Sequence, residues 1–286
     1  MMEQFKEKLI QSAVKTALNE DLGDSGDVTS NAIFNDGDRG DALIKSKGSG
    51  ILSGSYLIAP VFDACGGDVK VEMISQDGDI LKPGTEICRL HGPVKQILAG
   101  ERTILNFLQH LSGIATAVSS IVEKLSKTNT KLLDTRKTLP GLRFFEKQAV
   151  VDGGGFNHRF GLYDMILIKD THIKKAGSVK EALVKAFRYR EKYTELKIEI
   201  EVQSVEDFCI ALDMKPNRIM LDNMSIDTMK YCVNKRNTEQ KSVELEASGN
   251  ISIDTAFAIA QTGVDYISCG SVTHSTAALD LHLIIL

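Results

Sequence analysis

The stretch Ile198-Glu-Ile-Glu-Val-Gln-Ser-Val-Glu-Asp-Phe-Cys-Ile-Ala-Leu-Asp-Met-Lys-Pro-Asn-Arg-Ile-Met-Leu-Asp222 decides the fold class of this protein. It opens with five residues in which apolar and charged side chains alternate, which predicts a strand at 198–202. Helical spacing follows at about 204–213, and a second apolar run lies at 218–221. A strand, a helix and a second strand of these lengths are typical of a parallel sheet with crossover helices.

The same alternation fills the chain after residue 130. The predicted strands lie at 131–134, 165–168, 198–202, 218–221, 243–247 and 264–268, and the predicted helices between them at about 178–192, 204–213, 225–235 and 252–261. A barrel is favoured over a doubly wound sheet because no strand leads into G-x-G-x-x-G. The run Gly153-Gly-Gly155 precedes Asn157-His-Arg159 instead of a clear helix.

The first part of the chain has a different pattern of apolar and polar residues. Helical spacing at about 3–20 is followed by a polar loop at 20–29. Short apolar runs punctuated by Gly and Pro at 40–98 predict a small β-sandwich or half-barrel. A helix is then predicted at 101–125, with a candidate break at Gly113.

Composition excludes several classes of protein. The 286 residues are 43% hydrophobic and 25% charged, a globular balance that argues against disordered and fibrous proteins. A net charge of −4 argues against nucleic-acid binding. No apolar run approaches the roughly 18–20 residues of a membrane span, and Met1–Leu9 is a charged amphipathic stretch without a signal-peptide core. Five scattered cysteines without a C-x-x-C pair predict reduced thiols in a cytoplasmic protein.

The predicted strands end in polar or charged residues. These ends are Arg136 and Lys137, Lys169, Glu201, Asp222, Ser248-Gly249 and Gly270-Ser271. The active site of a βα barrel forms at the carboxyl ends of its strands, so these side chains are expected to converge.

The chemistry of these residues points to anionic substrates. Seven basic residues lie between positions 136 and 169, namely Arg136, Lys137, Arg143, Lys147, His158, Arg159 and Lys169. Arginine pairs with carboxylate and phosphate oxygens in a bidentate manner. Glu201 and Asp222 suit Mg²⁺ that bridges to phosphates, and Ser248-Gly-Asn250 and Gly270-Ser271 suit a phosphate group. A phosphorylated, Mg²⁺-bound sugar-like substrate and a second anion are therefore expected.

The chain resembles the quinolinate phosphoribosyltransferases, also called carboxylating nicotinate-nucleotide diphosphorylases. The resemblance runs in order over nearly the whole chain. It is carried by Glu20-Asp-Leu-Gly-Asp-x-x-Asp-Val-Thr29, Glu101-Arg-Thr-x-Leu-Asn106, Ser112-Gly-Ile-Ala-Thr116, Asp134-Thr-Arg-Lys-Thr-x-Pro-Gly-Leu-Arg143, Glu146-Lys-x-Ala149, Gly153-Gly-Gly-x-Asn-His-Arg-x-Gly-Leu162, Leu167-Ile-Lys-Asp170, Glu199-x-Glu-Val202, Leu221-Asp-Asn223, Glu246-Ala-Ser-Gly-Asn250 and Thr273-His-Ser275.

The resemblance implies an α/β fold with two domains. An N-terminal α/β sandwich at 1–112, joined by the C-terminal segment 275–286, would accompany an incomplete, TIM-like α/β barrel at 113–274. The implied reaction joins quinolinate and phosphoribosyl pyrophosphate to give nicotinate mononucleotide, pyrophosphate and CO₂ in NAD biosynthesis. A homodimer with shared active sites is also implied, a higher oligomer stays open, and no redox cofactor is needed.

Roles for single residues follow from the resemblance. Lys137, Lys169, Glu201 and Asp222 are expected to be catalytic, and Glu201 and Asp222 to hold Mg²⁺. The expected substrate-binding residues are Arg102, Thr135, Arg136, Lys137, His158, Arg159, Lys169, Glu201, Asp222, Ser248, Gly249, Asn250, Gly270, Ser271 and His274. Arg102 would reach the site of the partner subunit.

Several alternatives stay open at this point. Glu199 lies on the same strand face as Glu201 and competes with it for the role of functional acid. Lys169 follows four apolar residues, so its ammonium group is expected near the core, where it could form an imine in a lyase. A related phosphoribosyltransferase with another acceptor and a non-catalytic anion-binding module are the remaining rivals.

Overall fold

The computed structural model describes residues 2–286, and side chains from Phe5 onward. Met1, where the predicted first domain and the predicted amphipathic stretch begin, lies outside the described residues. Contacts divide the chain into two compact units. The first unit holds the residues up to Ala117 together with Leu139–Gly154 and Thr276–Leu286, and the second holds Val118–Thr138 and Gly155–Ser275.

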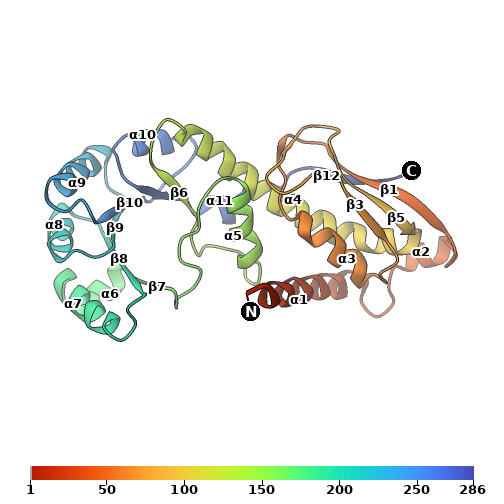
Figure 1. Cartoon of the computed structure of the whole chain (residues 1–286), viewed down its shortest axis with the longest axis horizontal. Coiled ribbons are helices and arrows are strands. Elements are labelled where there is room, and N and C mark those ends of the chain that lie inside the picture. Colours follow the sequence, from red (N-terminus) through yellow and green to blue (C-terminus); the bar gives the residue numbers. More distant parts are fainter. Residues whose placement is uncertain (1) are drawn as a thin grey trace. The chain divides into compact units, whose positions relative to one another are not determined.

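The first unit is built on an antiparallel sheet with the strand order β12-β1-β5-β3 (Figure 1). The strands of this unit are β1 (Arg39–Ser46), β2 (Gly50–Ile51), β3 (Lys70–Met73), β4 (Ile80–Leu81), β5 (Glu86–Pro93) and β12 (Leu281–Ile285). In β1, Ile44 is fully buried and lies opposite Cys88 of β5 and Leu283 of β12. The C-terminal strand therefore completes the sheet of the N-terminal part of the chain.

The first unit also contains five helices and one 3₁₀ turn among the described residues. They are α1 (Met2–Leu22), α2 (Val28–Ile33), the 3₁₀ turn Ser55–Leu57, α3 (Ile58–Ala64), α4 (Val94–Leu125) and α5 (Arg143–Asp152). Helix α1 confirms the predicted first helix, whereas α2 occupies the end of the predicted polar loop because the Asp27 carboxylate caps the backbone N–H groups of Thr29 and Ser30.

Helix α4 runs without a break through Gly113, so the predicted break there is wrong. A side chain at Gly113 would collide with the backbone carbonyl of Ala277, and the glycine thus permits the close approach of the C-terminal segment. By length and composition α4 could cross a membrane, but 56% of its most apolar stretch is buried inside the protein. That burial is what the central helix of a globular unit shows.

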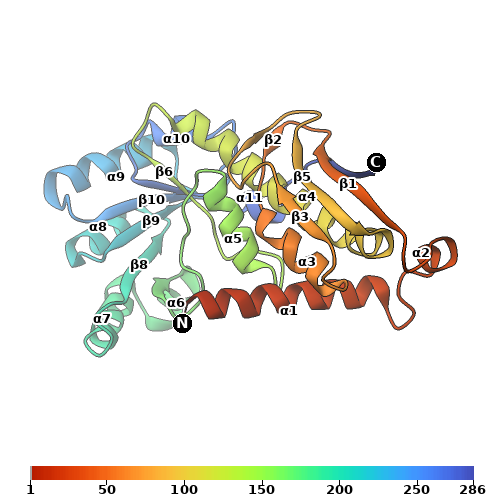
Figure 2. The ribbon, with the colours of Figure 1, turned by 45° about the vertical axis from the view of Figure 1, so that its right-hand side comes forward.

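The second unit is built on a six-stranded parallel sheet with the order β6-β11-β10-β9-β8-β7 (Figure 2). Its strands are β6 (Lys131–Leu133), β7 (Met165–Ile168), β8 (Lys197–Val202), β9 (Arg218–Asp222), β10 (Glu244–Ser248) and β11 (Tyr266–Ser268). Its helices are α6 (Asp170–Ala176), α7 (Val179–Arg190), α8 (Val205–Met214), α9 (Ile226–Glu239), α10 (Ala256–Ala260) and α11 (Ser271–His274). All six predicted strands are confirmed to within about two residues at each end.

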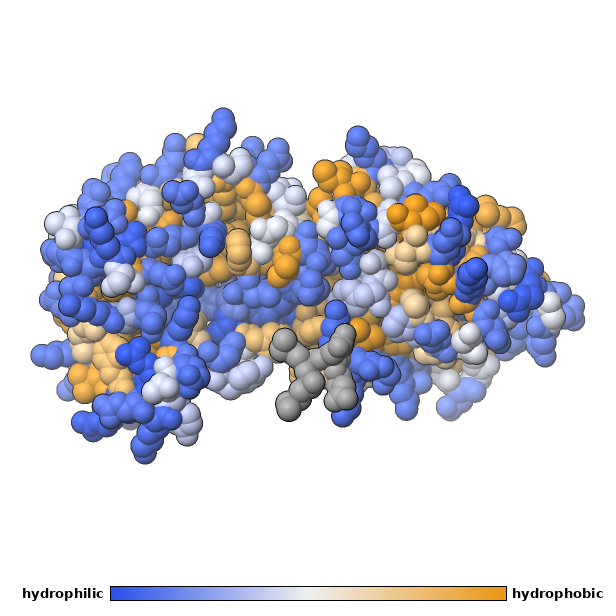
Figure 3. All heavy atoms as spheres, viewed as in Figure 1, coloured by the Kyte–Doolittle hydropathy of each residue, from blue (hydrophilic) through white to orange (hydrophobic). Residues whose placement is uncertain are grey.

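The barrel of the second unit is incomplete. Strands β6 and β7 do not pair within the sheet, and the nearest pairing at this gap is the isolated parallel bridge between Leu133 and Phe156. Serine side chains cap the helices that follow β8 and β9, because Ser204 and Ser225 accept from the first-turn N–H groups. Figure 3 shows mainly hydrophilic residues over α8 and α9, as expected for helices that cover a sheet on its solvent side.

Residues 139–154 group with the first unit, whereas the predicted boundaries placed them in the barrel domain. Helix α5 within this segment was missed from the sequence. Its Phe145 is buried against Phe107 of α4, with ring centroids 6.2 Å apart. Asp152 at its end accepts a 2.6 Å hydrogen bond from the Ser53 hydroxyl. These contacts with the first unit explain the grouping.

Candidate active site

A pocket of about 440 Å³ opens at the carboxyl ends of the parallel strands. It is lined by Thr135, Arg136, Lys137, His158, Arg159, Leu167, Lys169, Glu201, Met220, Asp222, Glu246, Ser248 and Ser268. An adjoining pocket of about 620 Å³ shares Thr135, Lys137, Asp222, Ser248 and Ser268, and adds Asn223, Gly249, Asn250, Ile251, Ser252, Cys269, Gly270, Ser271 and His274. The predicted convergence of strand ends is therefore observed.

Arg136 and Arg159 give the first pocket its positive charge. The Nε atoms of both guanidinium groups are buried and have no hydrogen-bond partner among the described residues. Burial, followed by repulsion from Arg136, lowers the pKa of Arg159, which is nevertheless far from losing its proton at pH 7. Two guanidinium groups held this close without a carboxylate between them fit a ligand with two negative charges.

Glu201 and Asp222 lie at the mouth of this pocket, at the ends of neighbouring strands β8 and β9. Lys169 Nζ is 3.4 Å from Glu201 Oε2. Asp222 Oδ2 accepts from Gln203 Nε2 at 3.0 Å and from Asn223 Nδ2 at 2.9 Å. Its Oδ1 has no partner among the described residues, which leaves an oxygen ligand for a cation.

The prediction that the ammonium group of Lys169 lies near the core is wrong. Its side chain is 47% exposed, because the residue follows β7 as the N-cap of α6 and points to the mouth. The side chain is exposed and lies beside the Glu201 carboxylate, whereas an imine-forming lysine needs an apolar setting. The lyase alternative therefore loses its structural basis.

Small residues shape the second pocket. Gly249 has a φ of +93°, and a side chain there would collide with the Asn223 side-chain amide. A side chain at Gly270 would come within 2.8 Å of Lys137 Cδ and 3.3 Å of His274 Nε2. Glycine at these two positions lets the backbone approach a ligand and keeps Lys137 and His274 beside it, as a phosphate site requires.

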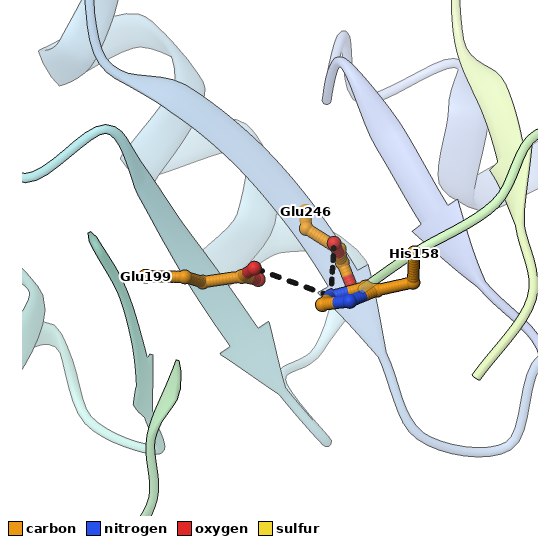
Figure 4. A group of neighbouring side chains, drawn as sticks. All are labelled: His158, Glu199 and Glu246. Atoms are coloured by element: carbon orange, nitrogen blue, oxygen red, sulfur yellow. Dashed lines mark ion pairs between the residues drawn. The ribbon is translucent and has the colours of Figure 1, made fainter. Parts of the chain in front are cut away.

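A second charged layer lies beneath the mouth (Figure 4). His158 Nε2 is 3.2 Å from Glu199 Oε2 of β8 and 3.4 Å from Glu246 Oε2 of β10. Arg218 of β9 reaches Glu246 Oε2 at 2.9 Å and Glu199 Oε2 at 3.8 Å. We call His158, Glu199, Arg218 and Glu246 the buried ionic layer. Both glutamates are inaccessible to solvent, so Glu199 is not the acid at the mouth.

The buried ionic layer balances its own charges. Burial and the nearby Glu246 raise the pKa of Glu199 to about 7. Burial lowers the pKa of His158, but hydrogen bonding and attraction from Glu199 and Glu246 more than offset this and raise it to about 9. His158 Nδ1 accepts the Arg159 N–H, and only an unprotonated Nδ1 can do so, which opposes the rise. His158, Glu199 and Glu246 are grouped closely enough to ligate a metal, but the Arg218 guanidinium already supplies the cation there.

Three of the basic residues predicted from the sequence lie outside both pockets. Arg143 and Lys147 belong to α5 of the first unit, and Lys147 is almost fully buried. Arg102 is exposed on α4, where it lines a separate hollow of about 260 Å³ with Asn106 and His110. Every other predicted site residue lines one of the two pockets of the second unit.

Comparison with known proteins gives a consistent result over the whole chain. The family described as quinolinate phosphoribosyl transferase, N-terminal domain, matches residues 27–112, and its C-terminal domain matches residues 114–284. The chain belongs to the quinolinate phosphoribosyltransferase family.

Individual relatives agree with this assignment. The probable nicotinate-nucleotide pyrophosphorylase [carboxylating] of Bacillus subtilis is 41% identical, with 92% of this chain and 89% of the relative aligned. The chloroplastic enzyme of the same name from Arabidopsis thaliana is 37% identical over 96% of this chain and 82% of the relative. The nicotinate-nucleotide pyrophosphorylase structure from Francisella tularensis superposes with a TM-score of 0.91 at 36% identity, covering 98% of this chain and 96% of that one.

Within this phosphoribosyltransferase, sequence reasoning gave no role to Glu246 or Arg218. The sequence nevertheless contains a pattern that could have indicated their role. In Glu244-Leu-Glu-Ala-Ser248, Glu246 shares one strand face with Glu244 and Ser248, opposite the buried Leu245 and Ala247, and Arg218 begins the neighbouring strand. Charged residues at inward positions of two adjacent strands indicate that they pair with each other.

Proposed function

We propose that this phosphoribosyltransferase transfers the phosphoribosyl group of phosphoribosyl pyrophosphate to quinolinate and releases pyrophosphate and CO₂. The product would be nicotinate mononucleotide, a precursor of NAD. The observation that carries the proposal is the pair of half-buried arginines, Arg136 and Arg159, whose buried Nε atoms have no hydrogen-bond partner among the described residues, beside a pocket of small residues. Quinolinate is a pyridine with two adjacent carboxylates, and it fits the charge of such a pair.

The residues of the chain would bring the reactants together. Arg136, Arg159 and Lys169 would bind the quinolinate carboxylates and aim the ring nitrogen at the anomeric carbon, an arrangement that can contribute several orders of magnitude in rate. Ser248, Gly249 and Gly270 would cradle phosphate. As the ring nitrogen forms its bond to the anomeric carbon, the bond to the pyrophosphate oxygen breaks, and the carboxylates of Glu201 and Asp222 stabilise the positive charge that develops on the ribose.

Decarboxylation follows from the charge on the ring. Once the nitrogen is ribosylated it is cationic, so the bond between ring carbon 2 and its carboxylate can break. The electron pair stays on the ring carbon, which the adjacent cation stabilises, and a proton then replaces CO₂. No residue of the chain needs to form a covalent intermediate.

Mg²⁺ is the cation we propose for the mouth. Glu201 and Asp222 supply carboxylate oxygens on adjacent strands, and the unpartnered Oδ1 of Asp222 fits a hard cation that keeps most of its waters. When bound, Mg²⁺ would neutralise the charge of the pyrophosphate. The direct measurement is binding of Mg²⁺ with phosphoribosyl pyrophosphate by calorimetry, which Asp222→Asn should weaken.

We also propose a homodimer with shared sites. Arg102 lies in the first unit and lines neither pocket of the second unit, and the family resemblance assigns it to the partner's quinolinate. Arg102→Ala and Lys169→Ala should each be nearly inactive. After subunit exchange about half of the dimers are mixed and each has one intact site, so activity should recover to about a quarter of wild type. Absence of recovery, despite exchange shown by a fluorescence label, argues against a shared site.

One incubation tests the proposed function. The protein is mixed with quinolinate, phosphoribosyl pyrophosphate and Mg²⁺, and nicotinate mononucleotide, pyrophosphate and CO₂ should form in equal amounts. Nicotinate offered as the acceptor distinguishes a related transferase. Borohydride trapping at Lys169 would reveal a lyase, and ligand binding without pyrophosphate release would indicate a binding module.

A further inference from the structure

Helix α6 begins at a residue of the candidate site. Its N-cap is Lys169, which follows β7 and whose ammonium group pairs with Glu201 at the mouth of the pocket. None of the helix residues Asp170–Ala176 is buried, so little packing against the core holds this helix in place. The hydrogen bonds at its ends therefore matter more for its position than they do in a helix with a buried face.

The three helices that come next in the chain differ from α6 in how their first turns are capped. Ser178, Ser204 and Ser225 precede α7, α8 and α9, and each serine side chain accepts a backbone N–H of the first turn. Lysine has no acceptor atom in its side chain, so Lys169 cannot do this for α6. A residue that serves the pocket thus stands where the other helices have a capping side chain.

His172 supplies a cap in the opposite direction. Its Nδ1 accepts the backbone N–H of Lys169 at 2.9 Å, and the Lys169 carbonyl accepts the N–H of Ile173 at 3.0 Å. Position 172 is the third residue of the helix, where a glutamate or glutamine side chain commonly accepts this N–H. A ring nitrogen accepts only when it carries no proton, so the ring in this bond is neutral, with its proton on Nε2. His172 therefore fixes the Lys169 backbone without adding a charge.

The charges around Lys169 explain why a neutral acceptor matters. Lys169 Nζ lies 3.4 Å from Glu201 Oε2. Burial above all, and then the nearby Asp222 and Asp170, raise the pKa of Glu201, which the ammonium group in turn lowers. Three carboxylates thus lie around this one ammonium group. A glutamate at position 172 would place a fourth beside the Lys169 backbone, where it would compete with an anionic ligand for the ammonium group.

We propose that His172 is a positioning residue, which as a neutral acceptor fixes the Lys169 backbone at the start of α6 and leaves the ammonium group to the anionic substrate. This inference deepens the proposed function and rests on it, because Lys169 is taken there to bind a carboxylate of quinolinate. His172 itself lines neither of the two pockets, so it is assigned no contact with the substrate.

Three substitutions of His172 separate this role from a general effect on the helix. His172→Gln keeps a neutral acceptor, His172→Glu supplies a charged acceptor, and His172→Ala supplies none. A glutamate in the first turn of a helix favours the helix, so a merely structural cap predicts that the glutamate variant performs at least as well as the glutamine variant in every respect. The proposed role predicts instead that the two variants differ in their affinity for the anionic substrate.

Steady-state kinetics with quinolinate, phosphoribosyl pyrophosphate and Mg²⁺ measure this difference. We expect KM for quinolinate to stay within about twofold of wild type in His172→Gln and to rise about five- to tenfold in His172→Glu, although the glutamate variant melts at no lower temperature. In His172→Ala, kcat/KM for quinolinate should fall about tenfold, the effect of one misplaced charged contact. The exposed Lys174 offers a matched control, because Lys174→Gln also makes α6 more negative by one charge and should change KM less than about twofold. Equal KM values in the glutamate and glutamine variants would overturn the proposal.

Hydrogen exchange supplies a readout that needs no reaction. In the full-length, ¹⁵N-labelled protein the Lys169 amide should be protected in wild type and in the glutamine and glutamate variants, and should exchange at least about tenfold faster in His172→Ala. Unchanged exchange in His172→Ala would show that His172 does not hold this backbone, and would also overturn the proposal.

Failure of the proposed function is distinguishable from failure of this inference. If wild type forms no nicotinate mononucleotide, the proposed function is wrong, and calorimetric binding of inorganic pyrophosphate replaces KM as the measure of anion affinity. The glutamate variant should then bind pyrophosphate more weakly than the glutamine variant, and equal affinities would overturn the positioning role.

Discussion

Glu199 and Glu201 are the same residue type on the same face of β8, two positions apart, yet they lie in different environments. Glu199 is inaccessible to solvent and is surrounded by His158, Arg218 and Glu246. Glu201 lies at the mouth and contacts the exposed Lys169. A separation of two residues along β8 thus places Glu199 among structural ion pairs and Glu201 where it can contact a ligand.

The neighbouring strands repeat this difference. On β10, Glu246 belongs to the buried ionic layer and Ser248 to the mouth, and on β9 Arg218 and Asp222 are separated in the same way. The opposite charges of the buried layer lie within ion-pair distance of one another, although several of its carboxylate oxygens have no hydrogen-bond partner among the described residues, whereas the charges of the mouth lie where a ligand can reach them. The charged side chains of the buried ionic layer therefore have a structural role, whereas those at the mouth of the pocket have a functional one.

The largest expected effect is on stability and falls on the buried layer. Glu246→Leu removes the closest partner of Arg218, whose side chain is only 12% exposed. Loss of one member of a buried ion pair typically lowers the free energy of unfolding by about 3–5 kcal/mol. Because Arg218 keeps its contacts with Glu244 and Glu199, we expect a loss of about 3 kcal/mol. Urea unfolding measures it. Asp222→Asn at the mouth is the matched control, with an expected change below about 1 kcal/mol, and equal losses would abolish the distinction between the layers.

Asp222→Asn should instead lower turnover by about 100-fold, because it retains the shape of the side chain and removes the charge that faces the ribose and Mg²⁺. Steady-state kinetics at saturating substrates give the number, and circular dichroism verifies the fold. If this variant turned over like wild type, Asp222 would belong with the structural charges.

Arg136→Ala should raise KM for quinolinate by roughly 10- to 100-fold and leave KM for phosphoribosyl pyrophosphate within about threefold. A charged hydrogen bond is worth about 1.5–3 kcal/mol, and the Arg136 guanidinium has no protein carboxylate to satisfy it. Arg143→Ala, on α5 of the first unit, is the matched control and should alter neither constant. A loss shared equally between both substrates would show that Arg136 is not specific for the quinolinate site.

The smallest effect concerns the pH dependence of stability. The pKa of His158 is raised to about 9 in the folded protein, above its unfolded value of about 6.5. The stabilisation from the charged ring is therefore complete below about pH 6.5 and is lost as the pH rises through about 9. Because the Arg159 N–H opposes ring protonation, we expect a loss of about 1–2 kcal/mol.

Urea unfolding of wild type and His158→Gln at about pH 6 and about pH 9.5 isolates this contribution as a difference between the two slopes. A wild-type slope no steeper than that of the variant would mean that His158 stays neutral throughout. That result would assign the charge balance of the buried layer to Glu199.

Much of the second unit could be predicted from local patterns. Period-two alternation and βα spacing located all six strands, and the polar residue at each strand end located the pockets. The elements of the first unit were harder to predict from the sequence, because β2 and β4 are only two residues long and α3 lies among Gly- and Pro-rich turns. Helix α5 was missed for a different reason, since its apolar face is formed by Phe145, Ala149 and Val150 against residues remote in the chain.

The sequence by itself determined the fold class, the family and the strand-end residues that line the pockets, because these depend on spacing along the chain. Tertiary structure alone decided which glutamate of β8 is buried, that residues 139–154 make their contacts with the first unit, and that Lys169 is exposed. Each of these depends on neighbours that are remote in sequence. The buried ionic layer, for example, joins positions 158, 199, 218 and 246, and only folding brings those charges within ion-pair distance, where burial makes their pairing obligatory.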